Sequence, residues 1–265
     1  CFAAPAYAAL DDQQAEQELR REREANRAFD RWMQRNTTAH RVPGYAIVTL
    51  SLKPAGIAPG DATDRQMDLI ADLADRYSFG ELRVTHEQNL VLADVPKSKL
   101  PELWEIIRKA GLATPNIGLL TDIICCPGGD FCSLANAKSI PVAEAIQRRF
   151  DDLDYLHDLG DIDLNISGCM NACGHHHIGQ IGILGVDKKG AEFYQVSLGG
   201  NSGTDASLGT ILGPSFAQDA IADVIAAILG VYVAHRHATE SFLATYRRIG
   251  IEPFREAAYG KADQG

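Results

Sequence analysis

Hydrophobic positions recur with two different periods in the first half of the chain, and these periods define the expected elements. Residues 45–52 are apolar and β-branched, as is typical of a strand. Residues 64–78 place their apolar side chains on one face of a helix. Two short strands follow, and then a helix opened by a capping serine and closed by a glycine: 81–84, 89–93 and 98–111. The order β-α-β-β-α predicts a small α+β unit.

The second half of the chain predicts a larger α+β domain. Helices are expected where apolar residues form one stripe or proline occupies an early helical position. The expected strands are 163–167, 181–187 and 192–198, and the expected helices are 139–150, 214–236, 241–249 and 253–258.

Residues 11–36 show a third sequence pattern, because charged residues dominate and apolar residues gather only at Phe29, Trp32 and Met33. We expect one long, solvated connecting helix that docks through its last turn. These patterns divide the chain into three parts: an N-terminal segment with its connecting helix (1–41), the small unit (42–115) and the larger domain (116–265).

Charge and apolar content exclude two classes of partner. The chain has 265 residues with 25 Lys and Arg against 35 Asp and Glu, a formal net charge of -10. Without a basic run, this balance argues against nucleic acid and against an anionic membrane surface. The longest apolar run, residues 221–234, is interrupted by Asp223 and Gly230 and is shorter than the roughly 18 residues that a spanning helix needs. We therefore expect no membrane span.

Five of the six cysteines lie between positions 125 and 173, which favours metal or redox chemistry over a disulfide scaffold in a chain of this length. Cys126 and Cys132 form a C-x5-C pair, and Cys169 and Cys173 form a C-x3-C pair. Four thiolates are what a [4Fe–4S] cluster needs. Cys125 is surplus, since adjacent side chains do not easily ligate one cube, and we expect it to be a buried small side chain.

Other interpretations of these cysteines stay open at this point. A structural zinc site would use C-x2–4-C pairs, which the five-residue spacer fits poorly. Structural disulfides or buried thiols are further alternatives. The C-x-x-C of a thioredoxin-like redox pair is absent.

Three motifs resemble the sulfite and nitrite reductase haemoprotein family. They are CPGGDFC (126–132) followed by ISGCMNACG (166–174), RVTHEQNL (83–90) and SLGGN (197–201). The resemblance implies a [4Fe–4S] cluster beside a siroheme. It also implies that Cys126, Cys132, Cys169 and Cys173 ligate the cluster, and that Cys173 bridges to the siroheme iron.

Members of this family have two pseudo-repeated halves, and the chain resembles the C-terminal half. The resemblance therefore implies an α+β fold in which a small ferredoxin-like half unit precedes a larger α/β/α-layered, cluster-binding domain. The N-terminal half would be a partner and would supply the cations that bind a small anionic substrate, so no catalytic residue is assigned here.

Four further residues carry expectations from the same resemblance. Arg83 would meet a siroheme carboxylate, or else be an ion-paired surface residue. Asn171 would support the cluster loop as a turn former. Gly200 and Asn201 would approach the macrocycle, or simply end a strand. The resemblance implies nothing for the histidines at 175–177; their position directly after Cys173 and Gly174 would place one of them near the siroheme carboxylates, or else they fill a turn.

The implied reaction is the six-electron reduction of sulfite to sulfide, with nitrite to ammonia as the alternative. Ferredoxin or a flavoprotein would donate the electrons. The cytoplasm is the expected compartment, because the cluster cysteines must stay reduced. Two other classes stay open: a stand-alone [4Fe–4S] electron-transfer module without siroheme, and a zinc-stabilised binding module.

Overall fold

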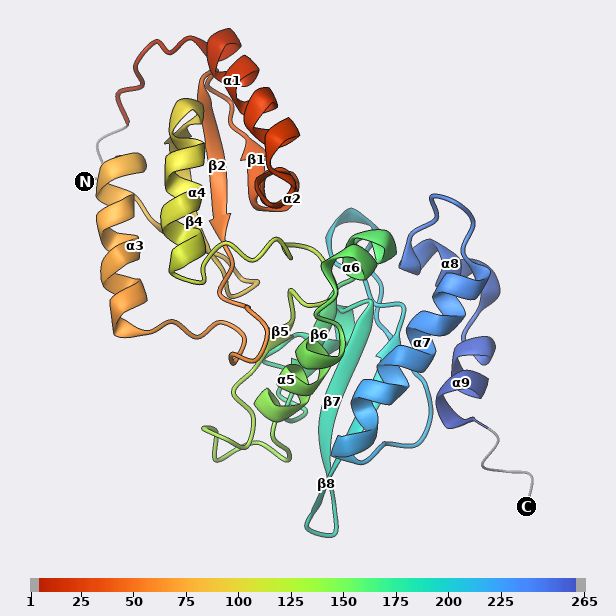
Figure 1. Ribbon diagram of the computed structural model, residues 1–265. Coiled ribbons are helices and arrows are strands. Elements are labelled where there is room, and N and C mark those ends of the chain that lie inside the picture. The colour runs from red at the N-terminus through yellow and green to blue at the C-terminus, as the bar shows by residue number, and fades with distance from the viewer. Residues whose placement is uncertain (1–4, 261–265) are drawn as a thin grey trace. The chain divides into compact units, whose positions relative to one another are not determined.

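A computed structural model describes residues 5–260 as two compact units, shown in Figure 1. The first unit comprises the chain up to Pro54 together with residues 60–117. The second unit comprises residues 55–59 and the chain from Gly118 onward. Cys1 lies outside the described residues.

The first unit is a four-stranded antiparallel sheet in the order β1-β2-β4-β3, with helices packed against it. Within residues 42–111 the order β2-α3-β3-β4-α4 confirms the expected β-α-β-β-α pattern. The elements are α1 (Asp12–Ala25), α2 (Arg27–Asn36), β1 (Thr37–Ala39), β2 (Tyr45–Leu50), α3 (Asp64–Tyr77), β3 (Arg83–Val84), β4 (Leu90–Pro96) and α4 (Leu100–Lys109).

The expectation of one solvated helix over residues 11–36 is wrong. The backbone of Asn26 is extended, with φ −134°, and its side-chain oxygen accepts hydrogen bonds from Ala28 and Phe29 at 3.1 Å. Asn26 therefore ends α1 and caps α2, as a residue that competes with the helix for backbone hydrogen bonds often does. Leu19 and Trp32 are buried in the core of the first unit, so both helices belong to that unit.

Two further differences concern the local chemistry of this unit. Ser98 does not cap α4, because it lies inside a 3₁₀ turn (Lys97–Lys99) that leads directly into the helix. Strand β1 was not expected, and its three residues pair with β2 at the sheet edge. Gly111 follows the end of α4 with φ +73°, as expected of a closing glycine.

The second unit contains a five-stranded mixed sheet in the order β5-β6-β7-β8-β9. The strands β5, β6 and β7 are parallel, and β7, β8 and β9 are antiparallel. The strands are β5 (Ile124–Cys125), β6 (Leu164–Ser167), β7 (Ile181–Lys188), β8 (Ala191–Leu198) and β9 (Thr210–Ile211). The helices are α5 (Ile140–Arg149), α6 (Leu153–Leu159), α7 (Ile221–His235), α8 (Phe242–Ile249) and α9 (Glu252–Tyr259).

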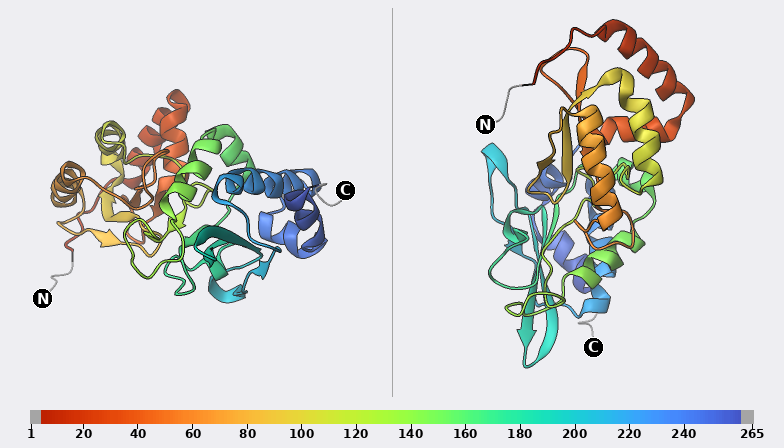
Figure 2. Two further views of the ribbon diagram at one scale, coloured as in Figure 1. Left: turned by 90° about the horizontal axis from the view of Figure 1, so that it is seen from below. Right: turned by 90° about the vertical axis from the view of Figure 1, so that its left-hand side faces the viewer.

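Helices α5, α6 and α7 lie together on one face of this sheet, as the views in Figures 1 and 2 show. Helix α7 begins later than the expected 214, because Phe216 first pairs with Tyr194 in an isolated bridge. Helix α6 was not expected, and Asp152 caps it by accepting from the amides of Asp154 and Tyr155. The mixed α+β class of the chain is confirmed.

The register of this sheet separates an apolar face from a polar one. Cys125 pairs with Ile166, which pairs with Ile183, and all three belong to the core formed with α5 and α7. Alternation along β6 turns Asn165 and Ser167 to the opposite face. There the Asn165 amide donates to the carbonyl of residue 175, and the Ser167 hydroxyl accepts from the amide of residue 174.

One segment of the described chain, Gln218–His235, is long and apolar enough by length and composition to cross a bilayer. This differs from the expectation that no run reaches such a length. Helix α7 packs against α5 and α9, and Val224, Ile225 and Ile228 are buried in the core. A helix in a protein core meets the same criterion of length and composition, so this segment is not evidence for a membrane span.

Candidate metal centre

Both cysteine loops follow the carboxyl ends of neighbouring parallel strands. Cys126 comes directly after β5, and Cys169 lies two residues after β6. The carboxyl ends of parallel strands share one edge of a sheet, and ligands of open α/β sheets bind there. The amides of Asn136 and Ala137 both donate to the carbonyl oxygen of Gly168, at 2.9 and 3.1 Å. These hydrogen bonds hold the two loops together.

Four cysteines, in two pairs that are distant from each other in the sequence, line one pocket. Its volume is about 400 Å³ when the open solvent at its mouth is included. Its other walls are short or apolar side chains and one amide, contributed by Pro127, Gly128, Leu134, Ala135 and Asn171. Cys169 is buried, Cys126 and Cys132 are half-buried, and Cys173 is exposed. Cys173 therefore lies on the solvent side of the pocket.

The donor set fits an iron–sulfur cluster better than a single metal ion. A tetrahedral zinc ion holds its sulfurs about 2.3 Å away, which brings them within roughly 4 Å of one another. Among the residues that the structure describes, no three His, Cys, Asp or Glu side chains lie close enough to hold one ion. Four thiols that share a pocket without converging on one point suit a centre with one iron for each thiolate.

Close backbone packing positions the sulfur of Cys126. A Cβ atom on Gly168 would lie 2.7 Å from the Ala137 carbonyl oxygen and 2.8 Å from the Cα of Gly128, so the loops approach more closely than a side chain permits. This approach lets the Gly168 amide donate to the Cys126 sulfur at 3.1 Å. The hydroxyl of Ser139 lies 3.6 Å from the same sulfur.

Cys125 lies on the other side of the strand end. Its side chain is 3% exposed and belongs to the core of the second unit. Its thiol donates to the carbonyl oxygen of Cys126 at 3.2 Å. The expectation that Cys125 is a buried small side chain is confirmed, and the alternation along β5 explains why its neighbour alone faces the pocket.

The residues Gly200 and Asn201 close a turn after β8. A Cβ atom on Gly200 would overlap the backbone of residues 177–179, so this glycine permits a close approach of two backbone segments. Asn201 pairs with Ser207 in an isolated bridge, and its amide donates to the carbonyl of Asp205 at 2.9 Å. These contacts are those of a strand end. Contact of either residue with a siroheme stays a prediction.

The histidines 175–177 connect β6 with β7. His175 adopts a left-handed conformation with φ +52°, and residues 176–178 form a 3₁₀ turn. His175 and His177 are exposed, whereas His176 is half-buried. Burial, and then the neighbouring His177, lowers the pKa of His176. The segment fills the turn before β7, and a role near siroheme carboxylates stays a prediction.

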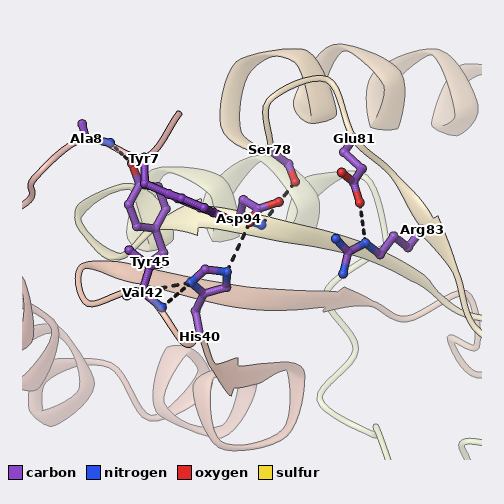
Figure 3. Close-up of polar contacts among 9 residues, drawn as sticks. All are labelled: Tyr7, Ala8, His40, Val42, Tyr45, Ser78, Glu81, Arg83 and Asp94. Atoms are coloured by element: carbon purple, nitrogen blue, oxygen red, sulfur yellow. Dashed lines mark hydrogen bonds and ion pairs between the residues drawn. The ribbon is translucent and has the colours of Figure 1, made fainter. Parts of the chain in front are cut away.

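Arg83 belongs to the first unit, on strand β3. Its side chain is 58% exposed and forms an ion pair with Glu81 (Figure 3). This is the ion-paired arrangement that the sequence analysis gave as the alternative to a siroheme contact. Contact of Arg83 with a siroheme carboxylate stays a prediction. The carboxyl of Glu81 raises the pKa of Arg83.

A second polar cluster in the first unit was missed from the sequence. Asp94 is 2% exposed, and it accepts a hydrogen bond from the hydroxyl of Tyr7 at 2.6 Å. The Nε2 atom of His40 lies 3.2 Å from the same carboxylate oxygen (Figure 3). These residues lie far apart in the sequence, and no motif links them. The cluster ties the segment that precedes α1 to strand β4.

The fold and the pocket define the class: an α+β protein with four cysteines gathered at the carboxyl ends of two parallel strands, the donor set that an iron–sulfur cluster uses. The more particular assignment comes from comparison with known families. Residues 42–110 match the nitrite/sulfite reductase ferredoxin-like half domain, and residues 119–264 match the nitrite and sulphite reductase 4Fe-4S domain. The chain belongs to the nitrite and sulfite reductase family. The cofactors expected from the resemblance, a [4Fe–4S] cluster and siroheme, are confirmed for this family.

Relatives with both reductase names match the chain. It is 31% identical to a ferredoxin sulfite reductase of Mycobacterium tuberculosis over 203 residues, which is 72% of the chain and 36% of that protein. It is 28% identical to an assimilatory ferredoxin-dependent nitrite reductase of Haloferax mediterranei over 205 residues, which is 75% of the chain and 34% of that protein. The chain therefore spans about a third of the length of these relatives.

Two solved structures have the same fold. The Mycobacterium tuberculosis NirA protein superposes with a TM-score of 0.68 at 28% identity, over 83% of the chain and 41% of that protein. Dissimilatory sulfite reductase I superposes with a TM-score of 0.67 over 82% of the chain and 70% of that protein. At 15% identity the second likeness supports the fold alone.

Proposed function

We propose that this chain is the cluster-bearing half of an assimilatory-type siroheme reductase that reduces sulfite to sulfide with six electrons. The observation that carries the proposal is the pocket that gathers Cys126, Cys132, Cys169 and Cys173 at one edge of the sheet. The family match over residues 119–264 supports it. The reduction of nitrite to ammonia is the second candidate, because relatives named for either substrate match the chain.

Cys173 is the residue proposed to bridge to siroheme. A bridging thiolate needs one side toward the cluster and one side accessible to a haem. Cys173 is exposed at the pocket mouth, whereas Cys169 of the same loop is buried. When bound, the two groups would supply single-electron transfer chemistry, and Cys126, Cys132, Cys169 and Cys173 would hold and position them.

The pocket itself does not bind the substrate anion in this proposal. Apart from the thiols, its lining residues carry no ionisable group. An anion such as sulfite needs Arg or Lys donors for binding and for stabilising the charge that develops during reduction. We propose that the N-terminal half of the same enzyme supplies these cations.

The electron donor and the compartment follow from the same proposal. A ferredoxin donor is favoured over a flavoprotein, because the names of the matched relatives specify ferredoxin. The cytoplasm is proposed as the compartment, since the four proposed ligand cysteines must stay reduced for the cluster to assemble.

The test is to co-express the chain with its N-terminal half and purify the complex without oxygen. Iron, acid-labile sulfide and siroheme are then counted, and kcat/KM is measured for sulfite and for nitrite with reduced ferredoxin. We expect about four irons and four sulfides in the cluster, one siroheme, and a higher kcat/KM for sulfite. A cluster without siroheme would instead identify a stand-alone electron-transfer module, and zinc without iron would identify a structural zinc site. A higher kcat/KM for nitrite would reverse the substrate assignment.

Two variants test the proposed ligand roles. We expect Cys173→Ser to abolish the magnetic coupling between cluster and siroheme, measured by low-temperature EPR. Cys125→Ser is the matched control, because Cys125 lies in the core and a serine can still donate to the Cys126 carbonyl. Equal loss of coupling in both variants would contradict the assignment.

A further inference from the structure

We propose that Ser139 sets the reduction potential of the cluster by donating a hydrogen bond to the sulfur of Cys126. This inference rests on the proposed role of Cys126 as a cluster ligand. Its physical basis is the position of a buried hydroxyl beside one ligand sulfur, a feature that the cysteine motif does not contain.

Ser139 occupies the cap position of α5 but does not cap the helix. A serine in this position usually accepts a hydrogen bond from the amide two or three residues further on. Here no such side-chain hydrogen bond forms, and proline follows within the first two helical positions. The Ser139 hydroxyl instead lies 3.6 Å from the Cys126 sulfur. The side chain thus forgoes a common stabilising contact and lies against the ligand.

Burial fixes this arrangement. Ser139 is 0% exposed, so bulk water does not compete for its hydroxyl. Cβ atoms built on Gly128 and Gly168 would lie 2.5 and 3.0 Å from the Ser139 oxygen, which places the hydroxyl where the two ligand loops meet. A metal-bound thiolate has no proton to donate, so in the loaded protein the hydroxyl is the donor.

Cys126 then has two donors, the Ser139 hydroxyl and the Gly168 amide, which lies 3.1 Å from the sulfur. Reduction adds one negative charge to the cluster, and hydrogen bonds to the sulfurs stabilise that charge. Loss of one donor therefore favours the oxidised cluster and makes the potential more negative. The amide belongs to the backbone, so Ser139 is the donor that substitution can remove.

The experiment uses the complete siroheme reductase that contains this chain. The cluster is titrated potentiometrically with EPR detection in the wild type, Ser139→Ala and Ser139→Cys. For Ser139→Ala we expect the ratio of reduced to oxidised cluster at a fixed solution potential to fall by about tenfold, a negative shift of about 59 mV for one electron. Ser139→Cys keeps a weak S–H donor, so its shift should be smaller and of the same sign.

Ser167→Ala is the matched control. Ser167 is also buried, at 1% exposure, but its hydroxyl accepts a hydrogen bond from the Gly174 amide. Unlike the Ser139 hydroxyl, it is not placed as a donor to a cysteine sulfur. We expect the wild-type potential in this variant. An unchanged potential in a fully loaded Ser139→Ala protein would overturn the inference, as would an equal shift in Ser167→Ala.

Cluster content separates the possible failures. If the wild-type protein carries no iron, the proposed function itself fails, and the role of Ser139 fails with it. If only Ser139→Ala lacks the cluster, the reduction potential of Ser139→Cys tests the inference instead. A wild-type potential in Ser139→Cys would contradict the hydrogen-bond role of Ser139.

Discussion

Replacement of Gly168 by alanine would force apart the two loops that hold the cysteines. The added Cβ would lie 2.7 Å from the Ala137 carbonyl oxygen, 2.8 Å from the Gly128 Cα atom and 3.0 Å from the Ser139 oxygen. Two of these atoms are backbone, so the overlap cannot be relieved by rotating a flexible side chain. The loops must separate, and the amide of residue 168 then moves away from the Cys126 sulfur.

The cost of this substitution is that of an overpacked interior, about 1–3 kcal/mol. In a unit of this size each kcal/mol lowers Tm by roughly 2–4 °C. We also expect the iron content to fall, because the pocket needs both loops in their present positions. Thermal unfolding followed by circular dichroism measures the first effect, and iron analysis of the purified protein measures the second.

Gly230→Ala provides the matched control. Gly230 lies inside α7, and a Cβ atom there would meet nothing within 4 Å. Alanine is the better helix former by about 1 kcal/mol, so Tm should stay constant or rise and the iron content should not change. If Gly168→Ala kept the wild-type Tm and full iron content, close packing of the two loops would not be what holds the cysteines together.

Three further substitutions test other parts of the molecule. Asn26→Ala removes the cap of α2 and should lower the free energy of unfolding by about 0.5–2 kcal/mol in a denaturant titration; no change would contradict the capping role. Hydrogen bonds from Arg248 lower the pKa of Glu240 from 4.5 to about 2, so its contribution is present above pH 4.5 and is lost between pH 4.5 and 2. Glu240→Gln should therefore lower Tm at pH 7 and flatten the fall of Tm across that window, whereas parallel curves would refute the assignment. Tyr7→Phe removes the hydroxyl that Asp94 accepts from and should speed hydrogen exchange in residues 5–10, measured by mass spectrometry.

Elements with a strong local signal were predictable. Helix α3 lies within one residue of its expected range, because its apolar face repeats with the helical period and Thr63 forms a capping box with Gln66. Strands β7 (Ile181–Lys188) and β8 (Ala191–Leu198) each lie within one residue of their expected ranges, 181–187 and 192–198. Local pattern suffices where propensity and burial agree.

Elements that depend on distant residues were missed or misplaced. The break at Asn26 becomes necessary only because Leu19 and Trp32 both enter the same core. The start of α7 depends on the pairing of Phe216 with Tyr194, which is distant in the sequence. Strand β1 is three residues long and exists through its pairing with β2. Such elements are stabilised by tertiary contacts that single-sequence patterns do not contain.

By itself the sequence determined the chemistry of the candidate centre, because four cysteines in two spaced pairs are a property of the chain alone. It also determined the order of elements in the small unit. The sequence also predicted that Cys125 is the surplus thiol, and the tertiary structure supplies the physical reason, since the register of β5 against β6 turns Cys125 into the core. The structure alone placed Ser139 beside Cys126, because the two loops meet through backbone packing at Gly128 and Gly168. Spacing along a chain specifies which donors are available, and folding specifies which of them reach the same point in space.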